Sequence, residues 1–175
     1  MQWRQAVDEL VSRRPLPAGE LSRLDVALRP TLVWGALHHP DPPARRLCLD
    51  YLDHLAGRGV AETITAALDD PVPRVRRHAI HALTCQACKP AGWHVDAVTP
   101  LRVIVARDPS PKVRFEALRA LLAHLDAAGR AGAMQAVIDA DDRPLLSEVV
   151  RARRRAVPAD LRTRAERVIG AATAA

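Results

Sequence analysis

One stretch decides the fold: residues 70–83 read Asp70-Pro71-Val72-Pro73-Arg74-Val75-Arg76-Arg77-His78-Ala79-Ile80-His81-Ala82-Leu83. Pro73 stands where a helix can begin, because the first helical residue has no need of its N–H donor. From Val75 onward the apolar and small residues recur every three to four positions, which places Val75, Ala79 and Leu83 on one helix face. The stretch therefore predicts an amphipathic helix that begins at Pro73.

Two further copies of this pattern occur, 31 residues earlier and 38 residues later. The later copy reads Asp108-Pro109-Ser110-Pro111-Lys112-Val113-Arg114-Phe115-Glu116-Ala117. The earlier copy is looser and reads His39-Pro40-Asp41-Pro42-Pro43-Ala44-Arg45-Arg46-Leu47-Cys48. Second amphipathic stretches follow the three copies, near residues 60–68, 96–107 and 131–140. Helix pairs that recur at this period cannot bury their apolar faces alone, so we expect them to stack on one another.

The shared pattern also resembles a known family. Residues 70–83 and 108–121 follow Asp-Pro-x-x-x-Val-Arg-x-x-Ala-x-x-Ala-Leu, which resembles HEAT and HEAT-like repeats, including those of phycobilin-lyase-like proteins. The resemblance covers about residues 39–140. It implies an all-α fold, a short right-handed α-solenoid of helical hairpins with capping helices at both ends. It also implies that Arg45, Arg76 and Arg114 pair with the Asp residues at repeat starts and hold successive repeats in register.

The repeats predict one domain over residues 1–175. Residues 1–38 are expected to form N-terminal capping helices, residues 39–140 three repeats, and residues 141–175 basic C-terminal capping helices. The capping helices are expected in four segments: residues 2–12, residues 19–38 with an interruption near Pro30, residues 144–155, and residues 158–172.

The composition excludes several classes of protein. The 175 residues are 49% hydrophobic and 26% charged but only 3% aromatic, which is typical of a globular protein of closely packed helices. The first residues do not read as a secretory signal, and no apolar run is long enough for a transmembrane helix. Three Cys at uneven spacing do not make a disulfide framework. We therefore expect a cytoplasmic monomer without membrane contact.

The most unusual local feature is a group of His and Cys residues after the second repeat start. On a continuous helix, His81, Cys85 and Cys88 stand at positions i, i+4 and i+7, so their side chains converge. Cys-x-x-Cys with a nearby His is half of a tetrahedral zinc site, which needs four ligands. Because the sequence holds no second pair of this kind, His94 or His78 has to supply the fourth ligand. The sequence therefore predicts a candidate zinc site of His81, Cys85, Cys88 and His94.

Two other interpretations of this group stay open. The equivalent positions in the next repeat are mostly polar, which favours a solvent-exposed outer face that holds no cofactor. Redox chemistry of Cys85 and Cys88 is the other interpretation. It is disfavoured because the pair lies towards a helix C-terminus, where the helix dipole raises the pKa of a thiol.

Basic residues gather at the C-terminal end. All but Lys89 and Lys112 of the 26 basic residues are Arg, and the formal net charge is +6. Residues 143–167 hold eight Arg against three acidic residues and so account for most of that charge. Phosphates are bound well by guanidinium groups. This predicts a candidate contact with nucleic acid or another acidic partner, the alternative being a solvated cap, and the candidate contact residues are Arg151, Arg153, Arg154 and Arg155.

Motifs for catalysis are missing from the sequence. It has no nucleophile elbow, no phosphate-binding Gly loop and no His-Glu metal motif, which favours a protein that is not an enzyme. We therefore expect a scaffold or protein-interaction module whose partner is another protein, because repeat surfaces distribute a contact over several helices. Two alternatives remain: a DNA- or RNA-binding protein that uses the C-terminal Arg cluster, and an accessory protein of the lyase-like type.

Overall fold

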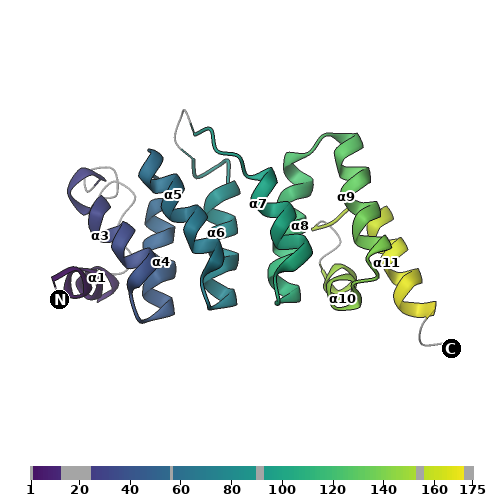
Figure 1. Ribbon diagram of the computed structural model, residues 1–175, viewed down its shortest axis with the longest axis horizontal. Helices are drawn as coiled ribbons and strands as arrows, with labels where there is room; N and C mark the ends of the chain where they lie inside the picture. Colours follow the sequence, from purple (N-terminus) through teal and green to yellow (C-terminus); the bar gives the residue numbers. More distant parts are fainter. Residues whose placement is uncertain (1, 13–24, 56, 90–92, 153–155, 172–175) are drawn as a thin grey trace. The chain divides into compact units, whose positions relative to one another are not determined.

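The computed structural model describes residues 2–12, 25–55, 57–89, 93–152 and 156–171. All regular secondary structure within these residues is helical (Figure 1). The predicted all-α class of helical hairpins is therefore confirmed. By their internal contacts the residues form two compact units, Met1–Val95 and Asp96–Ala175.

The first unit contains the first predicted repeat and the first helix of the second. Its helices are α1 (Gln2–Ser12), α3 (Asp25–His38), α4 (Pro42–Leu52), α5 (Arg58–Ala66), the short 3-10 helix η1 (Ala67–Asp69) and α6 (Pro73–Thr84). Helix α4 packs against both α3 and α6. The largest fully buried side chains between these helices are aliphatic: Val7, Leu49, Leu52, Val60, Ile64, Ile80 and Leu83. The core is thus made of small and aliphatic residues, as the scarcity of aromatic residues predicts.

The second unit begins with the second helix of the second predicted repeat and also contains the third repeat and the C-terminal capping helices. Its helices are α7 (Val98–Arg107), α8 (Pro111–His124), α9 (Ala127–Asp139), α10 (Arg143–Arg151) and α11 (Ala159–Ala171). Helix α8 packs against α7, α9 and α10, and α10 packs against α11. The core of this unit is again aliphatic, with Leu118, Leu122, Met134, Val137, Leu145, Leu146, Val149 and Leu161 buried together.

The sequence predicted the helix starts correctly, but it predicted the continuity of two helices wrongly. Pro42, Pro73 and Pro111 each begin a helix, as the repeat pattern predicts. The predicted interruption near Pro30 is wrong, because α3 continues through that residue. Pro30 has no N–H to donate to the helix, and the contacts of α3 with α1, α4 and α5 stabilise the helix in spite of this missing hydrogen bond. The predicted continuous helix through Cys88 is also wrong, since α6 ends at Thr84.

A ladder of Arg and Asp side chains joins consecutive repeats. Arg45 Nε and Nη2 donate to the two carboxylate oxygens of Asp70 over 2.6 and 2.9 Å, and both side chains are buried. Arg114 Nη2 donates to Asp142 over 2.9 Å in the second unit. Each Arg also donates to a carbonyl oxygen six residues before it in its own repeat, and Arg76 does so to Asp70. The predicted pairing of Arg45 with the Asp at the next repeat start is thereby confirmed. The carboxylate that Arg114 meets is Asp142, at the start of the C-terminal capping helices.

Candidate functional site

The first candidate site lies where α4 and α6 end. Asp53 is the residue that caps the C-terminus of α4, and Cys85 caps the C-terminus of α6. His81 belongs to the last turn of α6. Cys88 follows in a turn in which its N–H donates to the carbonyl oxygen of Cys85 over 3.3 Å. One ligand atom from each of these four residues lies within 4.8 Å of the other three, an arrangement suited to a metal ion.

The Asp53 carboxylate lies between a buried ammonium group and an imidazole. Its side chain is only 5% exposed, and it forms an ion pair with the ammonium group of Lys89, which is 2% exposed. Lys89 Nζ also donates to the Asp53 carbonyl oxygen over 3.2 Å and lies 4.5 Å from the centre of the Trp93 ring. The other carboxylate oxygen, Oδ2, lies 3.7 Å from His81 Nε2. Lys89 thus holds Oδ1 and leaves Oδ2 on the side of the imidazole.

The two thiols are close enough to influence each other. Cys85 Sγ and Cys88 Sγ lie 3.1 Å apart. The hydrogen bond with Cys85, burial and the neighbouring Asp53 carboxylate together raise the pKa of Cys88 to about 12. Without a metal the Cys88 thiol therefore keeps its proton at neutral pH, as the position near a helix C-terminus suggests.

The structure brings together three of the four residues predicted from the sequence. His81, Cys85 and Cys88 share the group, and its fourth member is Asp53; His94 is exposed and is not among the four. Sequence reasoning missed Asp53 because the residue belongs to the preceding repeat. A signal was present, since the offset of 31 residues aligns Asp53 with Thr84, next to Cys85. Residues at equivalent helix ends become neighbours when repeats stack.

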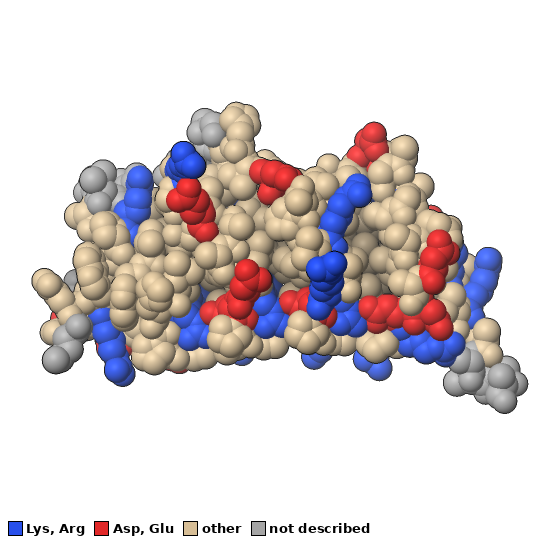
Figure 2. Space-filling model, viewed as in Figure 1, with Lys and Arg blue, Asp and Glu red and all other residues tan. Residues whose placement is uncertain are grey.

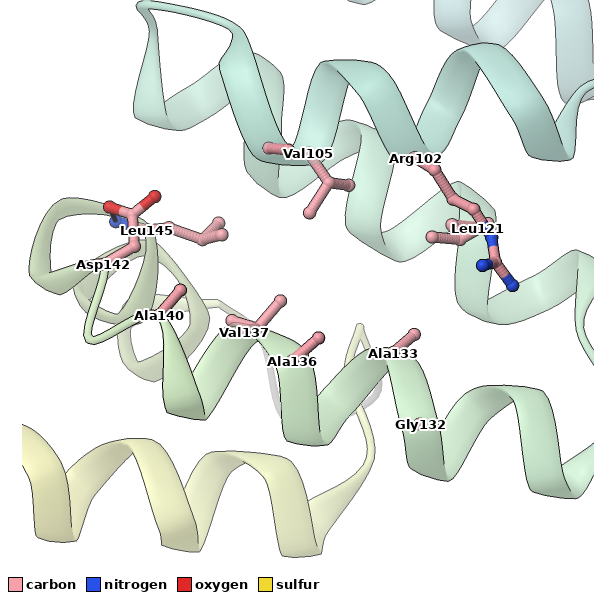
Figure 3. A pocket seen from close by; sticks show the side chains of 11 residues that line it. Arg102, Val105, Leu121, Gly132, Ala133, Ala136, Val137, Ala140, Asp142 and Leu145 are labelled. Carbon is pink, nitrogen blue, oxygen red and sulfur yellow. Dashed lines mark hydrogen bonds between the residues drawn. The ribbon is translucent and has the colours of Figure 1, made fainter.

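The second candidate site is an apolar groove in the second unit, with a volume of about 330 Å³. Figure 3 shows α7 on one side and α9 on the other, with Val105 of α7 pointing into the space between them. Leu121 of α8 and Leu145 of α10 also line the groove. The side contributed by α9 and its C-terminal capping residue carries only small residues and Val137: Gly132, Ala133, Ala136, Val137 and Ala140.

Charged residues stand at opposite ends of this groove, Arg102 at one and Asp142 at the other (Figure 3). Asp142 is engaged within the unit, since it accepts hydrogen bonds from Arg114 and from the N–H of Leu145. Arg102 is exposed, and among the described residues no carboxylate pairs with it. The groove therefore offers an apolar floor and one uncompensated cation.

The C-terminal arginines predicted to contact nucleic acid are only partly described. Arg151 lies 3.6 Å from Glu148 at the end of α10, and its side chain is exposed. Arg153, Arg154 and Arg155 lie outside the described residues. Nearby, Arg162 donates to the carbonyl oxygens of Val150 and Ala152, both over 2.7 Å. At least one arginine of this region thus caps the C-terminal end of α10.

The comparison with protein families agrees with the geometry. A model of HEAT repeats matches residues 29–121, which is more than half of the chain and spans α3 to α8. The chain belongs to the HEAT-repeat family. No curated protein and no solved structure matches this HEAT-repeat chain. Within its described residues, no helix combines the length and the apolar character that crossing a membrane requires.

Proposed function

We propose that this HEAT-repeat chain is a non-enzymatic protein-interaction module that holds a short segment of a partner protein in the groove of its second unit. The segment is apolar and carries a carboxylate that meets Arg102. The observation that supports this most is the groove itself, an apolar hollow with a cation at one end. HEAT repeats are commonly scaffolds for protein interactions, which agrees with this role.

The shape of the groove follows from the side chains of α9. Gly132, Ala133 and Ala136 are too small to fill the space that faces α7, so a hollow remains where longer side chains would have packed. Apolar side chains of a partner segment that enter it leave water, which stabilises the complex by roughly 25 cal/mol for each Å² that is buried. Recognition of an amphipathic segment in a groove of this kind is a recurrent mode of protein binding.

Charge selects the class of segment. An anionic group near Arg102 meets a cation that has no partner among the described residues. Asp142 at the other end does not repel such a segment strongly, because Arg114 already neutralises it. An acidic side chain or a free C-terminal carboxylate fits the first end, and a basic residue there would be repelled.

The proposal is tested by selecting peptides from a random library on the immobilised full chain. The selected peptides are expected to share apolar residues and at least one carboxylate, and to bind with a Kd on the order of 10 µM. Each peptide is then measured against two matched pairs of variants. Ala136→Glu places a charge in the groove and Ala131→Glu places it elsewhere on α9, while Arg102→Glu and Arg107→Glu reverse a charge inside and outside the groove on α7.

The first variant of each pair is expected to weaken binding at least tenfold and the second to leave it within twofold. All four residues are exposed, or nearly so, on helix surfaces, so the variants are expected to fold. Peptides that bind Ala136→Glu as tightly as the unchanged chain would refute the groove as the binding site. Binding of basic peptides only would refute the role of Arg102.

The two alternative functions gain no support from the geometry. The nucleic-acid proposal depends on Arg151, Arg153, Arg154 and Arg155, of which the structure describes Arg151 alone. Among the residues that the structure describes, none favours an accessory role of the lyase-like type.

A further inference from the structure

We propose that Asp53, His81, Cys85 and Cys88 bind one zinc ion, which fastens the ends of α4 and α6 to each other. The inference is independent of the groove, which belongs to the other unit. It differs from the site expected from sequence in its fourth ligand, which is a carboxylate of the neighbouring repeat.

The spacing of the donor atoms suits a tetrahedral ion. Zinc lies about 2.0–2.3 Å from its nitrogen, oxygen and sulfur ligands, so the ligand atoms of a tetrahedron stand roughly 3.5 Å apart. The two sulfurs lie 3.1 Å apart, Asp53 Oδ2 lies 3.7 Å from His81 Nε2, and all four donors are within 4.8 Å of one another. Small rotations about side-chain bonds therefore suffice to complete the tetrahedron.

The backbone presents the ligands from two directions. Cys85 and Cys88 stand in one turn after α6, and this turn points both sulfurs to one place. Asp53 approaches from the end of α4, and the two helices are packed together. Both helix ends carry the partial negative charge of a helix C-terminus, which favours a cation between them.

The charges also balance. When Zn²⁺ binds, the S–H bonds of Cys85 and Cys88 break and two protons pass to solvent, while the sulfur electron pairs form the bonds to the metal. The ion with two thiolates and the Asp53 carboxylate leaves one negative charge, which the ammonium group of Lys89 compensates. Lys89 is buried against Trp93 and fixes the carboxylate from behind, as the outer partners of zinc ligands commonly do.

Four protein ligands leave no open position on the ion. Such a closed set is typical of structural zinc, which stabilises a fold and does not activate water. The ion would join two consecutive repeats at the edge opposite the Arg45–Asp70 pair, which lies near the helix starts. Zinc is therefore expected to raise the thermal stability of the first unit.

The experiment measures zinc in the full chain, purified with a reductant and without a chelator. The unchanged protein is expected to retain about one equivalent of zinc after dialysis against metal-free buffer, and to melt at a higher temperature with zinc than without it. Co²⁺ in place of zinc is expected to give the thiolate charge-transfer absorption of a tetrahedral sulfur site. The cobalt spectrum needs no variant, so it tests the proposal even where a variant fails to fold.

Two matched pairs of variants identify the ligands. The double variant Cys85→Ser/Cys88→Ser is expected to lose zinc, whereas Cys48→Ala, which removes a buried cysteine elsewhere, keeps it. His81→Ala is expected to bind zinc at least about tenfold more weakly, and His94→Ala is expected to bind it unchanged. Circular dichroism confirms that each variant is folded.

Three results would overturn the proposal. They are less than about half an equivalent of zinc on the reduced protein, zinc retained by the Cys85→Ser/Cys88→Ser variant, or a cobalt spectrum without the thiolate absorption. Loss of zinc in His94→Ala would overturn the assignment of Asp53 as the fourth ligand. Two results together would favour the redox interpretation instead: a disulfide between Cys85 and Cys88 that forms in air, and no zinc on the reduced protein.

Discussion

His39 takes, in the first repeat, the position that Asp70 and Asp108 take in the next two. In those repeats a carboxylate oxygen accepts a hydrogen bond over 2.8 Å from the N–H two residues further on. His39 does the same with Nδ1, which accepts from the N–H of Asp41 over 3.1 Å. Its Nε2 then carries the proton and donates to Asp8 over 3.1 Å. Donor and acceptor are thus exchanged at the first repeat, because α1 offers Asp8 to His39 whereas α4 offers Arg45 to Asp70.

The Arg45–Asp70 pair gives a prediction about stability. Replacing Arg45 by Met keeps the length of the side chain but leaves the Asp70 carboxylate buried without its partner. We expect this to lower the free energy of unfolding by about 3–5 kcal/mol. The matched control is Arg58→Ala, which breaks an exposed pair with Glu62 and is expected to cost less than about 0.5 kcal/mol. Urea titration followed by circular dichroism measures both, and equal costs would contradict a structural role for the ladder.

The Cys88 thiol gives a prediction about pH. Iodoacetamide reacts with a thiolate, so the rate of alkylation follows ionisation. In the metal-free folded protein the pKa of Cys88 is raised from 9.0 to about 12, and the thiol therefore stays protonated while an unfolded chain ionises. We expect the initial alkylation rate of Cys88, followed by mass spectrometry of its peptide, to keep rising above about pH 10, where the rate in the urea-unfolded chain has levelled off. A plateau near pH 10 in the folded protein would contradict the raised pKa.

At the scale of elements, α1, α3 and α4 approach one another at Gly35. A Cβ atom on this residue would lie 2.5 Å from Cys48 Sγ and 2.8 Å from a methyl group of Val7. Both neighbours are fully buried, so neither has room to move away. The absence of a side chain at Gly35 thus sets how closely the first three helices pack.

Gly35→Ala is therefore expected to destabilise the protein by about 1–3 kcal/mol, because the added methyl group overpacks the contact. Gly59→Ala is the matched control, since nothing lies within 4 Å of a Cβ at that position in α5. That change is expected to stabilise the protein by up to about 1 kcal/mol, because alanine has a higher helix propensity than glycine. Urea titration compares the two, and a neutral Gly35→Ala would show that α3 and α4 are free to separate.

Local patterns were sufficient for helix starts and insufficient for helix ends. The proline at positions 42, 73 and 111 acts within one turn of its own helix, so the sequence predicts those starts directly. Helix α6 ends at Thr84, and five residues later Lys89 forms an ion pair with Asp53 at the end of α4. No periodicity within α6 encodes that contact, and the participation of Asp53 in the metal group was missed for the same reason. The groove escaped prediction because it depends on how far α9 stands from α7.

At the scale of the whole molecule, the net charge of +6 does not make a uniformly basic surface. Figure 2 shows acidic and basic side chains interleaved on the face that it draws. In the basic C-terminal region, Arg143 lies 3.4 Å from Asp141 and Arg151 lies 3.6 Å from Glu148. Asp141, which lies just before residues 143–167, thus neutralises part of their charge excess, whereas Glu148 is one of the three acidic residues already counted in it.

We accordingly expect weak binding to duplex DNA, with a Kd no tighter than about 100 µM at physiological salt. Fluorescence anisotropy of a labelled duplex at several salt concentrations measures it. The control is a variant with Arg153, Arg154 and Arg155 replaced by Ala. Tight binding whose salt dependence this variant flattens would favour the nucleic-acid alternative over a protein partner.

The central claim is that a partner segment binds between α7 and α9, and hydrogen–deuterium exchange of the full chain tests it most directly. The exchange is compared with and without a peptide selected on the unchanged protein. We predict slower exchange of amides in residues 98–107 and 127–140, with residues 2–89 unchanged. Protection confined to residues 143–171 or to the first unit, with none in α7 and α9, would contradict the claim.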